Sequence, residues 1–275
     1  MTIPWHLNVE LDESTPSLGT LSVLGRLRFK YEDVEDTSDD EIVLTAMRVV
    51  VRHEAMFRIR GASPGTPYPG RATIRLAGDR MTDNLGFGHT VIGSSTLAVL
   101  GEIELEGREA QLPWTKLAST AAAGSTVVTV NGNAKEGGWR VGDDVVVSTS
   151  SFSPAEAETR TISAIADAVT SAAGVTTSEV TFGSALSHAH EVTIATYDGT
   201  QVTTAPEVGL LTRNIRIEGA DVSDLKDPKD DTAFVATETD QFGARLLIAH
   251  EAQDVCTESY GGSALVRNVE FNKAG

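Results

Sequence analysis

The stretch "PEVGLLTRNIRIEG", residues 206–219, decides the fold, because a shorter version of it, "SALVRNVEF", returns at residues 263–271. Both stretches contain the pattern Leu-x-Arg-Asn-(Ile/Val)-x-(Ile/Phe). A phrase that occurs twice in one chain indicates a structural unit that is used more than once.

Period-two alternation of apolar and polar residues extends outward from this stretch. In "LGTLSVLGRLRF" (18–29), Leu27 and Phe29 share one side while Arg26 and Arg28 point the other way. In "RVVVRHEAMFRIRG" (48–61), apolar residues alternate with arginines in the same manner. Further short runs of this kind, separated by Gly, Asp, Ser and Pro, follow along the chain, and no segment predicts an amphipathic helix of three turns. The sequence therefore predicts an all-β fold.

Two all-β architectures compete. A sandwich would use tight hairpins, and the only such signals are "NGN" at 131–133 and "DG" at 198–199. A right-handed parallel β-helix, a single-stranded solenoid with short loops, instead stacks rungs of roughly 20–25 residues. The spacing of the two related stretches favours the β-helix.

The repeated stretch assigns structural roles within such a rung. Its apolar side chains are predicted to point inward: Leu211, Ile215 and Ile217. Asn214 is expected at a bend, where its amide satisfies turn backbone and stacks on a neighbouring amide. Asn268 is predicted to occupy the equivalent bend of a later rung. Gly219 then allows the next corner without a Cβ clash.

Composition excludes several classes of function. The chain has 275 residues and a formal net charge of −17, with 22 basic residues against 39 acidic ones, which argues against a nucleic-acid partner. No apolar stretch approaches the roughly 20 residues that span a bilayer, so we expect no direct membrane insertion. The start of the chain shows no secretory signal. The single cysteine, Cys256, excludes an internal disulfide and a cysteine zinc site, and we favour burial over a bridge to another chain.

Several phrases also resemble a known family. "LGTLSVLGRLRF", "LTAMRVVVRHEAMFRIRG" and "SPGTPYPGRATIRLAGDR" resemble the glycine-rich "G-eight" module of the family that includes fibrocystin, fibrocystin-L and the hyaluronan-binding and hyaluronan-degrading proteins related to them. "GDDVVVSTSSF" and "EVGLLTRNIRIEG" resemble the region that follows this module, and the fibrocystin-L branch is the most similar.

The resemblance implies a domain organisation. Residues 1–85 would be a partial G-eight domain that forms the first β-helix rungs, and residues 86–275 would continue the β-helix. The chain opens at "MTIPWHL", already inside the module, and stops at "VEFNKAG", where the family β-helix would continue. We therefore expect a fragment of an ectodomain, truncated at both ends and located at the cell surface or outside the cell.

The resemblance supports three hypotheses for function. The favoured one is a non-catalytic extracellular module of a larger glycoprotein, which binds an extracellular polysaccharide or a surface protein. The second is a glycosaminoglycan hydrolase that depolymerises a hyaluronan-like polysaccharide. The third is a structural component of an extracellular filament or coat that forms by self-assembly.

Weak catalytic candidates come from two short phrases. In "SHAHE", His188 and His190 would share one face of a strand about 7 Å apart, next to Glu191. In "EAE", Glu156 and Glu158 would place two carboxylates on one face, which suits a glycosidase only if they meet in a groove. A packed or solvated role is the favoured interpretation of all five, and no nucleophile elbow, phosphate loop or zinc-protease helix motif is present.

Binding candidates are equally sparse. His89, Trp114 and Arg213 are the candidates for carbohydrate contact. The acidic run at 221–240 includes Asp227, Asp230 and Asp231, which suit calcium, although their spacing is not that of a calcium loop and a solvated loop is favoured. No other cofactor is predicted.

Overall fold

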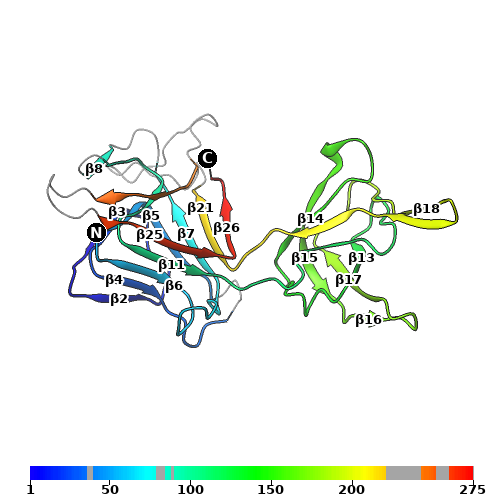
Figure 1. Cartoon of the computed structure of the whole chain (residues 1–275), viewed down its shortest axis with the longest axis horizontal. Coiled ribbons are helices and arrows are strands. Elements are labelled where there is room, and N and C mark those ends of the chain that lie inside the picture. Colours follow the sequence, from blue (N-terminus) through cyan, green and yellow to red (C-terminus); the bar gives the residue numbers. More distant parts are fainter. Residues whose placement is uncertain (36–39, 79–83, 88–89, 221–242, 252–259, 275) are drawn as a thin grey trace. The chain divides into compact units, whose positions relative to one another are not determined.

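The computed structural model describes residues 1–35, 40–78, 84–87, 90–220, 243–251 and 260–274. These residues form β-strands and turns, and the 3₁₀ turn Pro154–Glu156 is the only helical element among them. The prediction of an all-β chain is confirmed. The chain divides into two compact units (Figure 1). The main unit comprises Met1–Arg108 and Arg213–Gly275, and the inserted unit comprises Glu109–Thr212.

One sheet of the main unit has five strands, and all their pairings are parallel. Their order is β2 (Asn8–Leu11), β4 (Arg26–Phe29), β6 (Met56–Ile59), β11 (Glu102–Glu106) and β25 (Ser263–Arg267). The inward residues stay in register across it, with Leu27 opposite Phe57 and Phe57 opposite Ile103. All three are buried, which removes their apolar surface from water.

The other large sheet of the main unit is also parallel throughout. Its strands are β1 (Thr2–Ile3), β3 (Leu18–Val23), β5 (Ile42–Val51), β7 (Ala72–Leu76), β10 (Thr96–Val99), β21 (Ile215–Gly219), β22 (Arg245–Ile248) and β26 (Val269–Asn272). The chain passes from this sheet to the five-stranded one repeatedly, from β1 to β2, β3 to β4, β5 to β6 and β10 to β11. Each pass lays its strands beside those of the previous pass, and the two sheets share one core.

Two short antiparallel hairpins also belong to the main unit. They are β8 (Leu85–Phe87) with β9 (Thr90–Ile92), and β23 (His250–Glu251) with β24 (Tyr260–Gly261). In the described residues, each hairpin forms a two-stranded sheet of its own and adds no strand to the two parallel sheets.

Glycine is required where successive passes come closest. A Cβ at Gly101, between β10 and β11, would lie 2.1 Å from the Arg52 carbonyl oxygen and 2.5 Å from that of Ala55. A Cβ at Gly25, between β3 and β4, would lie 2.3 Å from the Leu7 carbonyl oxygen. These oxygens belong to the backbone of the preceding pass, so a side chain could fit only if the backbone moved.

The two related stretches lie side by side. Strands β21 and β26 pair in parallel, with Ile215 opposite Val269. Asn214 and Asn268 therefore hold equivalent positions just before paired strands, as the repeated phrase predicts. Ile215 and Ile217 are fully buried, in agreement with their predicted inward direction.

The Asn214 side chain ties together three separate parts of the main unit. Its Oδ1 accepts a hydrogen bond from the Arg108 N–H at 2.7 Å, and its Nδ2 donates to the carbonyls of Tyr68 and Gly70, both at 2.8 Å. The side chain is buried, so these bonds replace water for every polar atom involved. The amide thus bonds to backbone groups, and its predicted stacking on a neighbouring amide stays a prediction.

The structure agrees with the predictions for the remaining residues of the repeat to different extents. Leu211 is 43 % exposed, so its predicted inward position is wrong. It precedes β21 and belongs to the end of the inserted unit, where its N–H donates to the Asp144 carbonyl. Asn268 has a left-handed backbone, with φ of 51°, and its amide donates to the Gly107 carbonyl. Gly219 is the last residue of β21, and the corner predicted beyond it lies outside the described residues.

The inserted unit is antiparallel. Its main strands are β12 (Trp114–Lys116), β13 (Val127–Asn131), β14 (Asp144–Val147), β15 (Glu158–Ile165), β17 (Thr176–Phe182) and β20 (Glu207–Leu210), with β16 (Val169–Thr170) beside β17 and a separate hairpin of β18 (Thr193–Tyr197) and β19 (Thr200–Thr204). All these pairings are antiparallel, around a hydrophobic core of the unit's own. A parallel β-helix over the whole of residues 86–275 is therefore a wrong prediction for residues 109–212. Alternation with period two is the same in both kinds of sheet and does not distinguish them.

Candidate functional site

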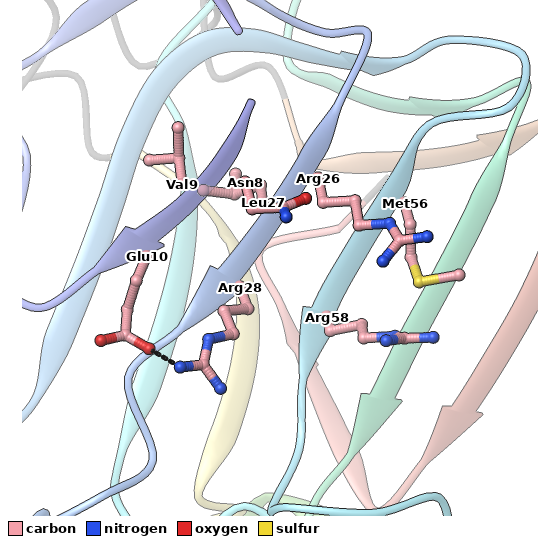
Figure 2. A pocket seen from close by; sticks show the side chains of 8 residues that line it. All are labelled: Asn8, Val9, Glu10, Arg26, Leu27, Arg28, Met56 and Arg58. Carbon is pink, nitrogen blue, oxygen red and sulfur yellow. Dashed lines mark ion pairs between the residues drawn. The ribbon is translucent and has the colours of Figure 1, made fainter. Parts of the chain in front are cut away.

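A groove of about 400 Å³ lies on the five-stranded sheet, and arginine side chains dominate it. Figure 2 shows its side chains on β2, β4 and β6. They form two rows that cross these strands in register: Asn8, Arg26 and Met56 in one row, and Glu10, Arg28 and Arg58 in the other. Val9 and Leu27, whose side chains alternate to the other face of the sheet, also line the groove. We call this the arginine groove, with Arg26, Arg28 and Arg58 as its defining residues.

Arg28 is held in place by its neighbours. Its guanidinium forms an ion pair with Glu10, drawn in Figure 2, and lies 3.6 Å from the Glu32 carboxylate. It also lies over the Tyr31 ring, 4.9 Å from the ring centroid, a cation–π geometry. The Tyr31 side chain and the two carboxylates raise the pKa of Arg28, so its charge is permanent.

Glu104 on β11 borders the groove and faces two arginines. Arg60 is 8 % exposed and donates to Glu104 Oε2 at 2.6 Å and to the Gly61 carbonyl at 3.0 Å. The Arg58 Nε lies 2.8 Å from the same oxygen, yet its N–H does not point at it, and this buried nitrogen has no hydrogen bond. Glu104 therefore attracts the positive charge of Arg58 but accepts no hydrogen bond from its Nε.

A smaller cavity of about 70 Å³ adjoins the groove. It shares Arg28 and Arg58 with the groove and adds Tyr31 and Arg60. The two cavities together present four guanidinium groups and one aromatic ring on one sheet face of an otherwise acidic chain.

Two of the predicted catalytic residues meet inside the inserted unit. His190 is fully buried, with Nε2 3.2 Å from Glu158 Oε1 and Nδ1 2.8 Å from the Ser148 carbonyl oxygen. Glu158 also forms an ion pair with Arg160 and accepts the N–H groups of Ser187 and His188 at 2.8–3.0 Å.

The surroundings of Glu158 hold its side chain in the ionised, carboxylate form. Burial acts to raise the pKa of this carboxyl, but the N–H groups of Ser187 and His188 and the ring of His190 outweigh burial and lower the pKa to about 2. A carboxylate so strongly held as an anion is a poor proton donor at neutral pH.

The side chains of the other catalytic candidates form no hydrogen bond with this pair in the described residues. His188 is exposed and stands at a bend, so the prediction that it shares a strand face with His190 is wrong. Glu156 lies in the 3₁₀ turn and accepts a hydrogen bond from the Ser151 hydroxyl at 2.7 Å, whereas Glu158 lies in β15. Glu191 is exposed, and its N–H donates to the Ser150 hydroxyl.

The predicted carbohydrate and metal residues are not brought together. Trp114 is 55 % exposed on β12 of the inserted unit, as a sugar platform requires. Arg213 lies in the main unit, where its N–H donates to Glu270 at 3.1 Å. His89 lies outside the described residues, as do Cys256 and the calcium candidates Asp227, Asp230 and Asp231. Within the described part of the chain, no cluster of three or more metal-binding side chains occurs.

Sequence reasoning missed the arginine groove, although a signal for it was present. Arg26 and Arg28, and then Arg58 and Arg60, alternate with buried apolar residues in two strands of an acidic chain. Alternating charges are the ordinary pattern of a solvated strand face, so the pattern alone predicts exposure. That the two strands are neighbours in register comes only from the structure.

The chain is similar to a known domain family and to several longer proteins. Residues 1–118 match the family model of the G8 domain. The chain is 28 % identical to Fibrocystin-L of Homo sapiens over 99 % of its own length, which is 6 % of the length of that protein. It is 33 % identical to Fibrocystin of Canis lupus familiaris over 46 % of the chain and 3 % of that protein. It is 29 % identical to Protein rliB of Dictyostelium discoideum over 58 % of the chain and 12 % of that protein.

The chain thus spans a small part of the relatives that it matches. The G8 match extends beyond the boundary at residue 85 expected from the sequence and includes β11. Among the residues that the structure describes, there is no helix with the length and apolar character needed to cross a membrane.

Proposed function

We propose that the chain is a non-catalytic binding module, because residues 1–118 match the family model of the G8 domain and the chain is similar to fibrocystin-L along nearly its whole length. The module acts at the cell surface or outside the cell, as part of a larger protein. Its partner is a carbohydrate or a protein that docks on the outer face of the five-stranded parallel sheet.

The arginine groove is the observation that carries this proposal. At about 400 Å³ it falls within the range of ligand sites in proteins, roughly 300–1,000 Å³. It is built on strands rather than on loops, so its side chains are positioned by the hydrogen bonds of the sheet.

The placement of the acid and base candidates supports a non-catalytic role. Glu158 and His190 are buried against each other, and Glu158 is saturated by backbone donors and Arg160. His188 contacts that pair through its backbone N–H, and the side chains of Glu156 and Glu191 form no hydrogen bond with it in the described residues. All five residues belong to the inserted unit rather than to the groove.

In this proposal the main unit is a right-handed parallel β-helix that carries the inserted unit at one of its turns. The parallel pairing of both large sheets and the repeated passage of the chain between them support the solenoid. Its handedness follows the strong preference of parallel crossover connections. A solenoid presents long flat sheet faces, which are common binding surfaces in repeat proteins.

The test separates binding from catalysis and from assembly. Purified chain is screened against glycan and protein arrays, and it is incubated with high-molecular-weight hyaluronan, with calcium or with a chelator. We expect specific array binding and no shortening of the polysaccharide. Shortening in either buffer would overturn the non-catalytic role, and end-to-end fibres in negative-stain images would replace it with a structural one.

A further inference from the structure

We propose that two copies of this chain pair through strand β18 of the β18–β19 hairpin, edge to edge and antiparallel, and so form a dimer. The contact is a continuous four-stranded sheet made of two hairpins, one from each copy. This interaction surface belongs to the inserted unit and is independent of the arginine groove.

The hairpin packs against little else. Every residue of β19 is exposed, as are all residues of β18 except Ala195, which is half-buried. Ile194 and Tyr197 are 63 % and 67 % exposed, and none of the strand residues of the hairpin belongs to a hydrophobic core among the described residues. Figure 1 shows the hairpin extending from the inserted unit. A two-stranded hairpin of this kind is marginally stable in water, so pairing with a further strand would stabilise it.

The edges of the hairpin lack the features that keep strand edges from pairing. Between Glu191 and Glu207 the only charged residue is Asp198, which lies in the turn, and neither strand contains a proline or a bulge. Among the described residues, β18 and β19 pair only with each other. Because lysine, proline and bulges are the usual protection of an exposed edge, this hairpin can accept another strand.

Ile194 and Thr196 offer their backbone groups to a partner strand. Tyr197 and Thr200 flank a two-residue turn and form its closing pair, so their N–H and C=O groups point toward each other. These directions alternate along a strand, so the N–H and C=O groups of Ile194 and Thr196 point away from β19.

Val192 marks the point where the free edge begins. Its backbone groups have the same direction as those of Ile194, and both are bonded to the Thr120 hydroxyl, the N–H at 3.0 Å and the C=O at 3.5 Å. These bonds agree with an outward direction. The free edge of β18 therefore comprises residues 193–197.

This edge is complementary to a second copy of itself. In an antiparallel pairing centred on Ala195, Ile194 lies opposite Thr196 of the second copy, so the outward groups of both residues pair. Tyr197 then lies opposite Thr193 of the second copy, which places an aromatic residue beside a β-branched one. Ala195 lies opposite itself on the two-fold axis, where its small side chain allows close approach.

Strand β18 suits this contact better than β19 does. It carries the larger exposed apolar side chains, Ile194 and Tyr197, whereas the exposed apolar side chain of β19 is Val202, at 45 %. Pairing through β18 gives each of the two larger side chains a cross-strand neighbour.

Charge favours a second copy as the partner. A strand that pairs with this edge gains nothing from charge and must itself be rich in β-branched residues, and the hairpin meets both conditions. The net charge of −17 opposes association of two copies. In the antiparallel arrangement the bases of the two hairpins lie at opposite ends of the contact, about 14 Å apart for four steps along a strand. This separation exceeds the Debye length of about 8 Å at physiological salt, so the repulsion is largely screened.

Sedimentation velocity on the intact chain measures the association. Two five-residue strands bury less than the roughly 1,200 Å² of a standard interface, so we expect a weak dimer that forms at about 0.1–1 mM. Because the two copies carry charge of the same sign, added salt should tighten the dimer. A chain that stays monomeric throughout this range, or that forms species larger than a dimer, would overturn the proposal.

A charged substitution tests the strand. Ala195→Lys places two ammonium groups directly opposite each other and should weaken the dimer about tenfold or more. Gln201→Lys is the matched control, because it adds the same charge at an exposed position of β19, on the opposite edge of the hairpin. We expect this control to associate like the unmodified chain. Equal weakening by both substitutions would overturn the assignment to β18.

Disulfide trapping tests the register and does not depend on a charged substitution. Cys256 is the single cysteine, so Ala195→Cys is made together with Cys256→Ser. Residues opposite each other at this position have Cα atoms about 4.5 Å apart, within the range of a disulfide. We expect mild oxidation to convert this variant to a covalent dimer, and Gln201→Cys in the same background to stay monomeric. Similar cross-linking of the two variants would overturn the register and leave the proposed binding function intact.

Discussion

Asn214 shows how one amide can fix the course of the chain. It holds Arg108, where the chain leaves the main unit, beside the loop of Tyr68 and Gly70. The stability of this junction therefore depends on three hydrogen bonds from a single buried side chain.

Replacing Asn214 is expected to be costly. Asn214→Ala leaves one N–H and two carbonyls without their partner, which predicts a loss of about 2–4 kcal/mol in the free energy of unfolding. Urea denaturation followed by far-UV circular dichroism measures it. Asn268→Gly is the comparison, because it removes one side-chain bond at an exposed position without straining the left-handed backbone there, and it should cost less. Equal losses would contradict the junction role.

Glu158 makes the inserted unit sensitive to acid. Its folded pKa of about 2 lies below the ordinary 4.5, so its contribution is fully present above about pH 4.5 and is lost as the pH falls through 2. That contribution is of the order of 3 kcal/mol. In Glu158→Gln, this part of the acid-induced loss should vanish.

Tryptophan fluorescence during urea unfolding, measured between pH 7 and pH 2, monitors this effect. Trp139 is buried in the inserted unit and Trp114 also lies there, whereas Trp5 of the main unit is 79 % exposed. If Glu158→Gln and the unmodified chain lost stability in parallel over this range, Glu158 would not be the group responsible.

At the scale of elements, glycines set the distance between successive passes of the chain. Gly101→Ala would place a methyl group against two backbone oxygens, which predicts a loss of about 2–3 kcal/mol or failure to fold. Gly19→Ala in β3 is the matched control, since no atom lies within 4 Å of a Cβ there. Thermal unfolding compares the two, and similar melting temperatures would show that the backbone yields at Gly101.

Strand alternation was readable from the sequence, but the pairing of strands was not. The pattern around Leu27 and Phe57 predicted buried and exposed faces correctly. The two hairpin signals, at 131–133 and 198–199, both fall in the antiparallel inserted unit. Asp198 and Gly199, with φ of 49° and 78°, form the turn of the β18–β19 hairpin. These signals were too few to locate the change of architecture.

The site was less predictable than the fold for a related reason. Single residues such as His190 attract attention in a sequence because their chemistry is distinctive, yet here that histidine is enclosed. The groove arises from ordinary arginines that become notable only when β4 and β6 pair in register. Local pattern gives the face of a residue, whereas a site needs the register between segments.

For the whole molecule, the two-unit division predicts separable folding. The inserted unit has its own core, and the chain segments that flank it are joined by the Asn214–Arg108 hydrogen bond. Replacing residues 109–212 with a short Gly-Ser linker should leave the main unit folded, and residues 109–212 alone should fold.

Hydrogen exchange read by mass spectrometry tests this separation. Each fragment should keep the protection pattern that it has in the intact chain. Loss of protection throughout both fragments would show that the two units form one cooperative structure.

The pairing of β7 with β21 and of β11 with β25 has a consequence for biosynthesis. The ribosome completes β7 and β11 and then makes the whole inserted unit before their later partners emerge. At about 5–20 residues per second, the roughly 140–160 residues between each strand and its later partner take about 7–30 s. During that interval the nascent chain presents unsatisfied strand edges, which must be shielded from other chains until translation supplies β21 and β25.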